Sequence, residues 1–262
     1  MLVLLKSEIR KIKRYRLLYA GVLLMLLSVI LTMLTTTAQD GSVWDYQMLY
    51  EQVIQQNMTM IFPMTITLII GFIINREIRD DTLKNLITVP VKYSKILGSK
   101  ILLGCILSLI YGMFSWLFTL IAYKLLGFCG LTLDLFFKSF WQITVFNLLL
   151  YIGISPLIAV TAKAGINHLI SVIFAFIFGY ASMFVSGNKL LLNIYPLTAG
   201  GAIIGFRSHD PAVKNMFNPV MSVISLSLTL LITLLIVKST NDNKSIAKKY
   251  LSKDKLRPKK GW

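Results

Sequence analysis

Residue types that could do chemistry are few in this chain, and their spacing suits no catalytic motif. Both histidines, His168 and His209, lack a second His or a Glu at the spacing of a helical metal site. The adjacent His209 and Asp210 would be two members of a Ser-His-Asp triad, but a turn before Pro211 explains this pair better. The sequence therefore predicts neither catalytic residues nor a metal site.

Cofactor-binding patterns are also missing. The two cysteines, Cys105 and Cys129, are too few for a disulfide framework or a Cys/His metal pattern. No Gly-Lys pair precedes Ser or Thr, so the glycine-rich loop that cradles nucleotide phosphates does not occur. We expect no cofactor on this chain.

The elements that would have to position such residues are built for lipid. Of the 262 residues, 56% are hydrophobic and 15% are charged, whereas soluble domains carry about 25% charged residues. The apolar residues form long blocks rather than the short alternating patterns of a globular core. One membrane domain is therefore expected.

Six apolar blocks are long enough to cross the hydrocarbon layer, which takes a helix of about 20 residues. Pro63 and Pro156 fall inside two of them and predict kinks. The sequence thus predicts an all-α integral membrane fold with a six-helix transmembrane domain over 17–237. The blocks are Leu17–Thr37, Met58–Asn75, Ile101–Tyr123, Phe140–Ala162, His168–Ser186 and Val220–Val237.

The net charge of +16 follows the expected topology. An even number of spans puts both termini on one side, and 22 of the 27 Lys and Arg residues then fall on that side. The positive-inside rule makes that side the cytoplasm. Topology and attraction to anionic membrane lipid therefore explain the charge, and nucleic acid is not needed as a partner.

Two basic segments flank the membrane domain. Residues 1–16 place Leu5, Ile9 and Ile12 at helical spacing among cations, which predicts an amphipathic interfacial helix. A positive stop that orients the first span explains this segment equally well. The lysine-rich residues 238–262 are expected to form a basic cytoplasmic tail at the membrane surface.

The most informative segment lies between the second and third blocks and reads NREIRDDTLKNLITVPVKYSKILGSK. Apolar residues recur in it at helical spacing, Asp80 and Asp81 favour a helix N-terminus, and Pro90 stops the helix. A short cytoplasmic helix over residues 78–90 is therefore predicted. Periodicity alone leaves open whether it is a charged connector or a docking element.

The string Glu77-x-x-x-x-Thr82-Leu83-Lys84-Asn85-Leu86, with Pro90-Val91 and Ser99-Lys100 after it, resembles ABC-2 type transporter permeases. It is most similar to the small permeases of lantibiotic-immunity, bacitracin-resistance and peptide-toxin exporters. The resemblance implies that residues 78–90 form a coupling helix seated in a cleft of a separate ATP-binding cassette ATPase, which binds ATP and Mg²⁺. The coupling residues that it implies are Glu77, Asp80, Asp81, Thr82, Leu83, Leu86, Ile87 and Pro90.

The same resemblance implies further partners. A second permease copy, identical or related, would complete the pathway as a homodimer or heterodimer in the bacterial cell membrane. The implied cargo is an amphipathic or antimicrobial peptide, or a similar membrane-active molecule.

The segment 187–219 contains two apolar pieces that are too short to cross, Leu190–Ile194 and Ala202–Phe206. Pro196 and the pair Gly200-Gly201 are expected to break them. By resemblance they are short re-entrant helices on the outer side. The alternative is a long exposed loop, which would leave many apolar residues in water.

No charged residue lies deep in a predicted span, which argues against a transporter driven by protons or ions. Gln142 and Asn147 are candidates for the substrate path, although such residues more often hold helices together. Two alternatives to an exporter stay open. One is an intramembrane enzyme, which the missing ionisable residues disfavour, and the other is a membrane assembly factor without transport activity.

Overall fold

The structure is a computed structural model that describes residues 2–12, 15–36, 44–79, 92–165 and 167–240. Helices dominate these residues, and their only β-type pairing is an isolated bridge between Asp45 and Cys129. The predicted all-α fold is confirmed. The elements are α1 (Leu2–Ile12), α2 (Leu17–Thr36), α3 (Tyr46–Gln56), η1 (Asn57–Ile61), α4 (Phe62–Arg79), α6 (Tyr93–Leu126), α7 (Leu133–Ala164), α8 (His168–Val185), α9 (Lys189–Ile194), α10 (Pro196–Ile204), α11 (Pro211–Lys214) and α12 (Pro219–Lys238).

Within the described residues, six helical stretches are long and apolar enough to cross a membrane, as predicted. α2, α8 and α12 match the predicted blocks to within one residue at each end. The other three begin earlier than predicted, at Tyr46, Tyr93 and Leu133. The largest difference is in the second span, which begins with α3. The polar residues of α3 lie before the predicted apolar block, although α3 belongs to the same helical stretch as that block.

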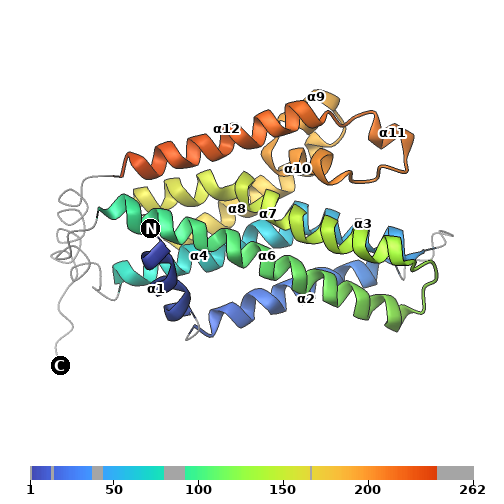
Figure 1. The fold of residues 1–262 in the computed structure, drawn as a ribbon, viewed down its shortest axis with the longest axis horizontal. Coiled ribbons are helices and arrows are strands. Elements are labelled where there is room, and N and C mark those ends of the chain that lie inside the picture. The colour runs from blue at the N-terminus through green and yellow to red at the C-terminus, as the bar shows by residue number, and fades with distance from the viewer. Residues whose placement is uncertain (1, 13–14, 37–43, 80–91, 166, 241–262) are drawn as a thin grey trace.

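The spans form one bundle with α6 and α7 side by side (Figure 1). α2 packs on α6, α12 packs on α7, and α8 packs on α4. α1 lies against the start of α6 at one end of the bundle, the end at which α12 also finishes, and we call this the α1 end (Figure 1). α9, α10 and α11 lie together at the opposite end, which we call the α9 end (Figure 1).

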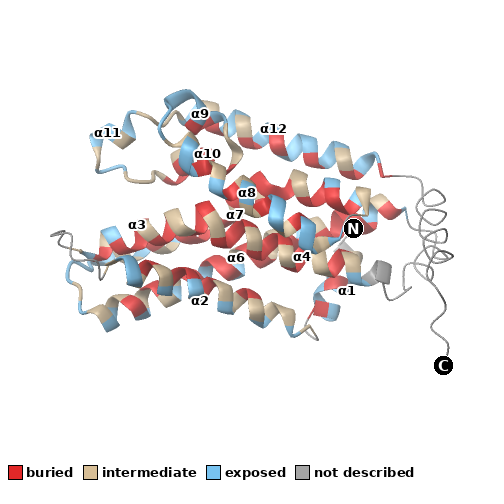
Figure 2. Ribbon diagram, turned by 180° about the vertical axis from the view of Figure 1, so that it is seen from behind, coloured by how far each residue is buried: buried red, intermediate tan, exposed pale blue. Residues whose placement is uncertain are grey.

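Burial is concentrated where α3, α4, α6 and α7 meet, whereas α2, α8 and α12 turn exposed residues outward (Figure 2). The outward residues include large apolar side chains such as Leu23, Phe184 and Leu234. A soluble protein would bury such side chains, whereas lipid solvates them. The exposure pattern therefore fits a bundle surrounded by lipid.

A glycine allows α6 and α7 to approach closely. A Cβ added at Gly104 would lie 2.3 Å from the Tyr151 side chain, so only glycine fits beside that ring. The Tyr151 hydroxyl donates to the carbonyl oxygen of Ile101 at 2.7 Å. This bond fixes a buried ring across the helix pair at the centre of the bundle.

The second span is interrupted by the π-helical turn η1 just before Pro63, which has no amide hydrogen to donate. α8 approaches closely at this turn, since a Cβ at Gly179 would lie 2.7 Å from the Thr59 carbonyl oxygen. Pro156 lies inside α7, which continues on both sides of it.

The segment 187–219 folds into the short helices α9, α10 and α11. The predicted second apolar piece is placed wrongly, because α10 starts with Pro196 at its first turn and ends before the left-handed Gly205. Gly200 and Gly201 lie inside α10 and do not break it. Their small size is needed there, because an added Cβ at either position would lie 3.0 Å from a neighbouring side chain.

Candidate functional site: two polar clusters at opposite ends of the bundle

The first cluster joins α1 to α6 at the α1 end. Lys100 donates to the carboxylate of Glu8 at 2.8 Å, and Lys11 donates to the other carboxylate oxygen at 2.9 Å. Glu8 and Lys100 are 4% and 3% exposed, so this ion pair is buried. Burial by itself would raise the pKa of Glu8, but the two lysines outweigh it and lower that pKa.

The same end carries a second contact between chain segments. The Arg76 guanidinium lies over the Tyr15 ring, 4.5 Å from its centre, and so links the connection after α1 to the last turns of α4. Because α4 and α6 flank residues 80–91 in the chain, both helices that border this segment also contact the N-terminal part of the protein.

Most of the predicted coupling residues lie outside the described residues. These are Asp80, Asp81, Thr82, Leu83, Leu86, Ile87 and Pro90. Glu77 lies in the last turns of α4. The coupling helix therefore stays a prediction, as does the structure of the tail beyond residue 240.

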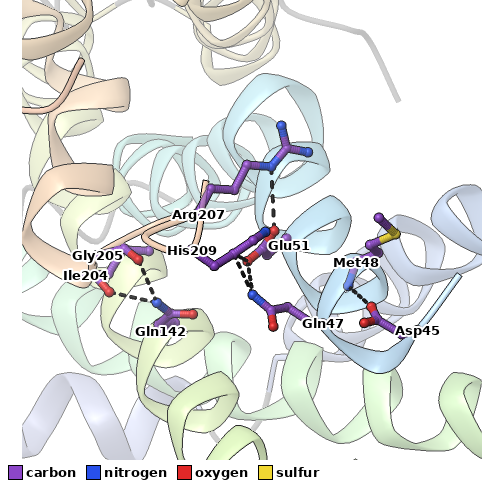
Figure 3. Close-up of polar contacts among 9 residues, drawn as sticks. All are labelled: Asp45, Gln47, Met48, Glu51, Gln142, Ile204, Gly205, Arg207 and His209. Atoms are coloured by element: carbon purple, nitrogen blue, oxygen red, sulfur yellow. Dashed lines mark hydrogen bonds and ion pairs between the residues drawn. The ribbon is translucent and has the colours of Figure 1, made fainter. Parts of the chain in front are cut away.

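The second cluster lies at the α9 end and centres on Glu51, which the sequence had placed outside any span. Its side chain is 5% exposed. Gln47 donates to one carboxylate oxygen at 3.1 Å, and the Arg207 Nε lies 3.6 Å from the other (Figure 3). The His209 Nδ1 lies 3.3 Å from Glu51 and 2.6 Å from the Gln47 amide nitrogen (Figure 3). The cluster therefore ties α3 to the loop between α10 and α11.

The two candidate substrate-path residues both lie on α7, and the structure gives them different surroundings. Gln142 donates to the carbonyl oxygens of Ile204 and Gly205 at 2.8 and 3.1 Å, and so holds the end of α10 (Figure 3). Asn147 is 1% exposed, and both polar atoms of its amide lack a hydrogen-bond partner among the described residues. The Gln142 amide nitrogen thus contributes to packing, while its Oε1 and the whole Asn147 amide lack a partner among the described residues. The substrate-path role of both residues stays a prediction.

The pair His209 and Asp210 does not form part of a triad. Asp210 accepts the amide hydrogen of Ala212 at 3.0 Å and caps the start of α11, as the turn interpretation predicted. Within the described residues, no group of three or more His, Cys, Asp or Glu side chains could hold a metal ion.

Sequence reasoning missed both clusters. Glu8 is the only acidic residue of α1, and nothing in its local sequence points to Lys100, which lies 92 residues away. The i, i+4 pair of Gln47 and Glu51 was visible as a helical signal, but its partners lie in a loop more than 150 residues later. Only the fold brings these groups together.

Comparisons with known proteins identify the family of this chain. The chain is 33% identical over 122 residues to the bacitracin transport permease protein BCRB of Bacillus licheniformis. The match covers 46% of this chain and 58% of the length of that relative. A family model described as ABC-2 family transporter protein matches residues 4–182, a region that runs from α1 through the first four spans and most of α8. The chain therefore belongs to the ABC-2 family of transporter proteins.

Proposed function

We propose that this chain is the membrane-spanning permease subunit of an ATP-binding cassette exporter. The observation that carries this proposal is family membership, together with six apolar helices and the absence of a phosphate-binding loop from the whole sequence. ATP and Mg²⁺ bind to a separate ATPase subunit, and this chain supplies the membrane path.

The proposed cargo is an amphipathic or antimicrobial peptide, or a similar membrane-active molecule, which leaves the cell or the bilayer. The name of the bacitracin transport permease supports this cargo class by analogy, since bacitracin transport is assigned to that relative.

The proposed orientation puts both termini, and therefore the α1 end, in the cytoplasm of a bacterial cell. The distribution of Lys and Arg supports it, because five of the 27 fall on the other side. A dimer of permeases, identical or related, is proposed from the family resemblance.

In the proposed mechanism, closure of the ATPase subunits moves residues 78–90, and the flanking helices α4 and α6 carry the movement into the bundle. The buried pair of Glu8 and Lys100 supports this route, because it makes α1 move with the start of α6. α1 would then act as part of the lever rather than as a passive anchor.

The test measures phosphate release by the permease alone, by its ATPase partner alone and by the reconstituted complex. We expect turnover only where the ATPase is present, and a response to Leu83→Asp, which places a charge on the apolar face of the coupling segment. Asn215→Asp adds the same charge at an exposed position at the α9 end, away from the coupling segment, and serves as the matched control. Robust turnover by the purified permease alone would refute the division of labour between the subunits.

A further inference from the structure

A small apolar cavity lies beside the second cluster at the α9 end. Its volume is about 160 Å³, and its wall is formed by η1 with the adjoining end of α3, and by α7, α9, α10 and the loops around α11. Most of the lining side chains are apolar, among them Ile54, Met58, Phe146, Phe206 and Phe217. Cavities of about this size and lining accept a group as large as benzene.

Among the described residues that line this cavity, one is a cation. Arg207 is among the residues that line it, and its guanidinium lies 5.5 Å from the centre of the Phe206 ring, another part of the wall. Arg207 reaches Glu51 through Nε, while its two terminal nitrogens point away from that carboxylate (Figure 3). A guanidinium presented in this way can bind a phosphate or carboxylate with two parallel hydrogen bonds.

The backbone at Arg207 supports a role beyond packing. Arg207 has a φ of +47° and is the only non-glycine residue with positive φ among the described residues. This conformation is uncommon for a side chain of this size, and such strain tends to occur at ligand sites. The loop therefore holds the guanidinium beside the cavity at a conformational cost.

We propose that the cavity and the Arg207 guanidinium form a binding site for an anionic single-chain lipid. The end of the apolar chain fills the cavity, and the phosphate or carboxylate head pairs with Arg207. The size of the cavity excludes a whole drug-sized ligand, which needs about 300 Å³ or more, and so limits the buried part to a chain end. This site stands independently of the proposed peptide export.

In this proposal, Glu51 lowers the affinity of the site for the lipid head. Its carboxylate competes with the lipid head for Arg207, because both are anions and the guanidinium lies between them. Removing the charge of Glu51 should therefore strengthen lipid binding, whereas removing the guanidinium should weaken it. A purely structural ion pair predicts no effect of either change on the lipid.

The experiment measures equilibrium binding of radiolabelled decyl phosphate to the full-length protein in phosphatidylcholine nanodiscs, with empty nanodiscs subtracted. Unlabelled decyl phosphate, decanol and inorganic phosphate serve as competitors. We expect saturable binding that decyl phosphate displaces, with decanol and inorganic phosphate at least about tenfold weaker, since each offers only one of the two contacts.

Four variants test the two halves of the site. Arg207→Asn removes the guanidinium and keeps a residue that tolerates positive φ, and Val213→Phe narrows the cavity from the short helix α11. Each should weaken binding by at least about tenfold. Glu51→Gln keeps a side chain that can bond Gln47 and should tighten binding. Lys189→Gln removes an exposed cation from the same end of the bundle, outside this cavity, and should leave binding unchanged.

Thermal unfolding of each variant checks that the fold is intact. The proposal is overturned if no saturable binding exceeds that of empty nanodiscs, or if Arg207→Asn and Val213→Phe bind as the parent does. Displacement by inorganic phosphate as strong as that by decyl phosphate would eliminate the cavity as part of the site, and equally strong displacement by decanol would eliminate Arg207. Weaker binding in Glu51→Gln would contradict the competition between Glu51 and the lipid head.

Discussion

Lys100 of α6 lies 2.8 Å from Glu8 of α1, and this contact between the two helices is buried. Removing one partner of a buried ion pair typically costs about 3–5 kcal/mol when the other charge is left unpaired. In Lys100→Met, Lys11 still donates to Glu8 at 2.9 Å, so the loss should lie toward or below the low end of that range. We therefore expect Lys100→Met to lower the thermal unfolding temperature of the detergent-solubilised protein.

The double variant Glu8→Gln with Lys100→Met should recover part of that loss, since it removes both buried charges together and leaves only the more exposed Lys11 without the carboxylate. Thermal unfolding of the parent, both single variants and the double variant gives the coupling between the two sites. Additive effects would show that the pair does not act as a unit.

Acid should loosen the same contact. The pKa of Glu8 is lowered in the folded protein, so its stabilising contribution is complete above the ordinary glutamate value and is lost as the pH falls through the lowered one. We expect the unfolding temperature to drop between about pH 5 and pH 3, around the ordinary value of about 4.3. Glu8→Gln should show a smaller drop over this interval, and an equal drop in both proteins would assign the effect to other carboxylates.

The contact between α6 and α7 should not tolerate a larger residue at Gly104. A methyl group there would overlap the buried Tyr151 ring, and overpacking a core costs about 1–3 kcal/mol. We expect Gly104→Ala to lower the unfolding temperature. Gly187→Ala is the matched control, because an added Cβ meets nothing within 4 Å there. Equal stability of the two variants would mean that the ring moves aside easily.

We expect the hydrogen bonds of Asn193 to hold the short helices at the α9 end together. Its amide nitrogen donates to the carbonyl oxygens of Lys189 and Met216, and its oxygen accepts from the Asn218 amide at 2.7 Å and from the Ser222 hydroxyl at 3.2 Å. Asn193→Leu leaves these groups unpaired, at about 1–3 kcal/mol for each one that stays buried.

Hydrogen–deuterium exchange checks this expectation. Exchange should rise in segment 187–219 of Asn193→Leu and stay unchanged in α4. Asn215→Leu, at an exposed position of the same segment, provides the control. Unchanged protection in 187–219 would show that packing of α10 alone holds the segment.

The proposed orientation predicts which cysteine reacts from outside. Cys129 is exposed at the turn before α7, whereas Cys105 lies partly buried within α6. A membrane-impermeant maleimide added to intact cells should label the parent and Cys105→Ser, but not Cys129→Ser. Labelling of Cys129 only after the cells are permeabilised would reverse the orientation.

Sequence patterns were sufficient for the features that depend on composition over a long window. The six spans follow from apolar runs, and α2, α8 and α12 were placed closely because lipid-facing residues make these runs almost continuous. The start of the second span was missed because residues 46–56 include polar residues such as Gln47 and Glu51 among buried apolar ones, and Glu51 is itself buried. Hydropathy averaged over a long window does not detect such a mixed helix.

The polar clusters depend on contacts between distant segments, and no local pattern encodes them. Arg207 and His209 read as loop residues until α10 places them against Glu51. The same holds for Gln142, whose contact with the end of α10 has no signal in the local sequence. Gly200 and Gly201 were misinterpreted as helix breakers, because the need for close packing appears only when α7 and the segment after α11 lie beside them.

The spans of this bundle differ greatly in length, and the bilayer has to accommodate the difference. α6 has 34 residues, but its uncharged part lies between Lys100 and Lys124 and is about 35 Å long at about 1.5 Å per residue, whereas the 18 residues of α8 give about 27 Å beside a hydrocarbon layer of about 30 Å. We therefore expect α6 to tilt or the bilayer beside it to thicken slightly, and the bilayer beside α8 to thin slightly. Lipid chain length is thereby coupled to the stability of the fold through hydrophobic mismatch alone.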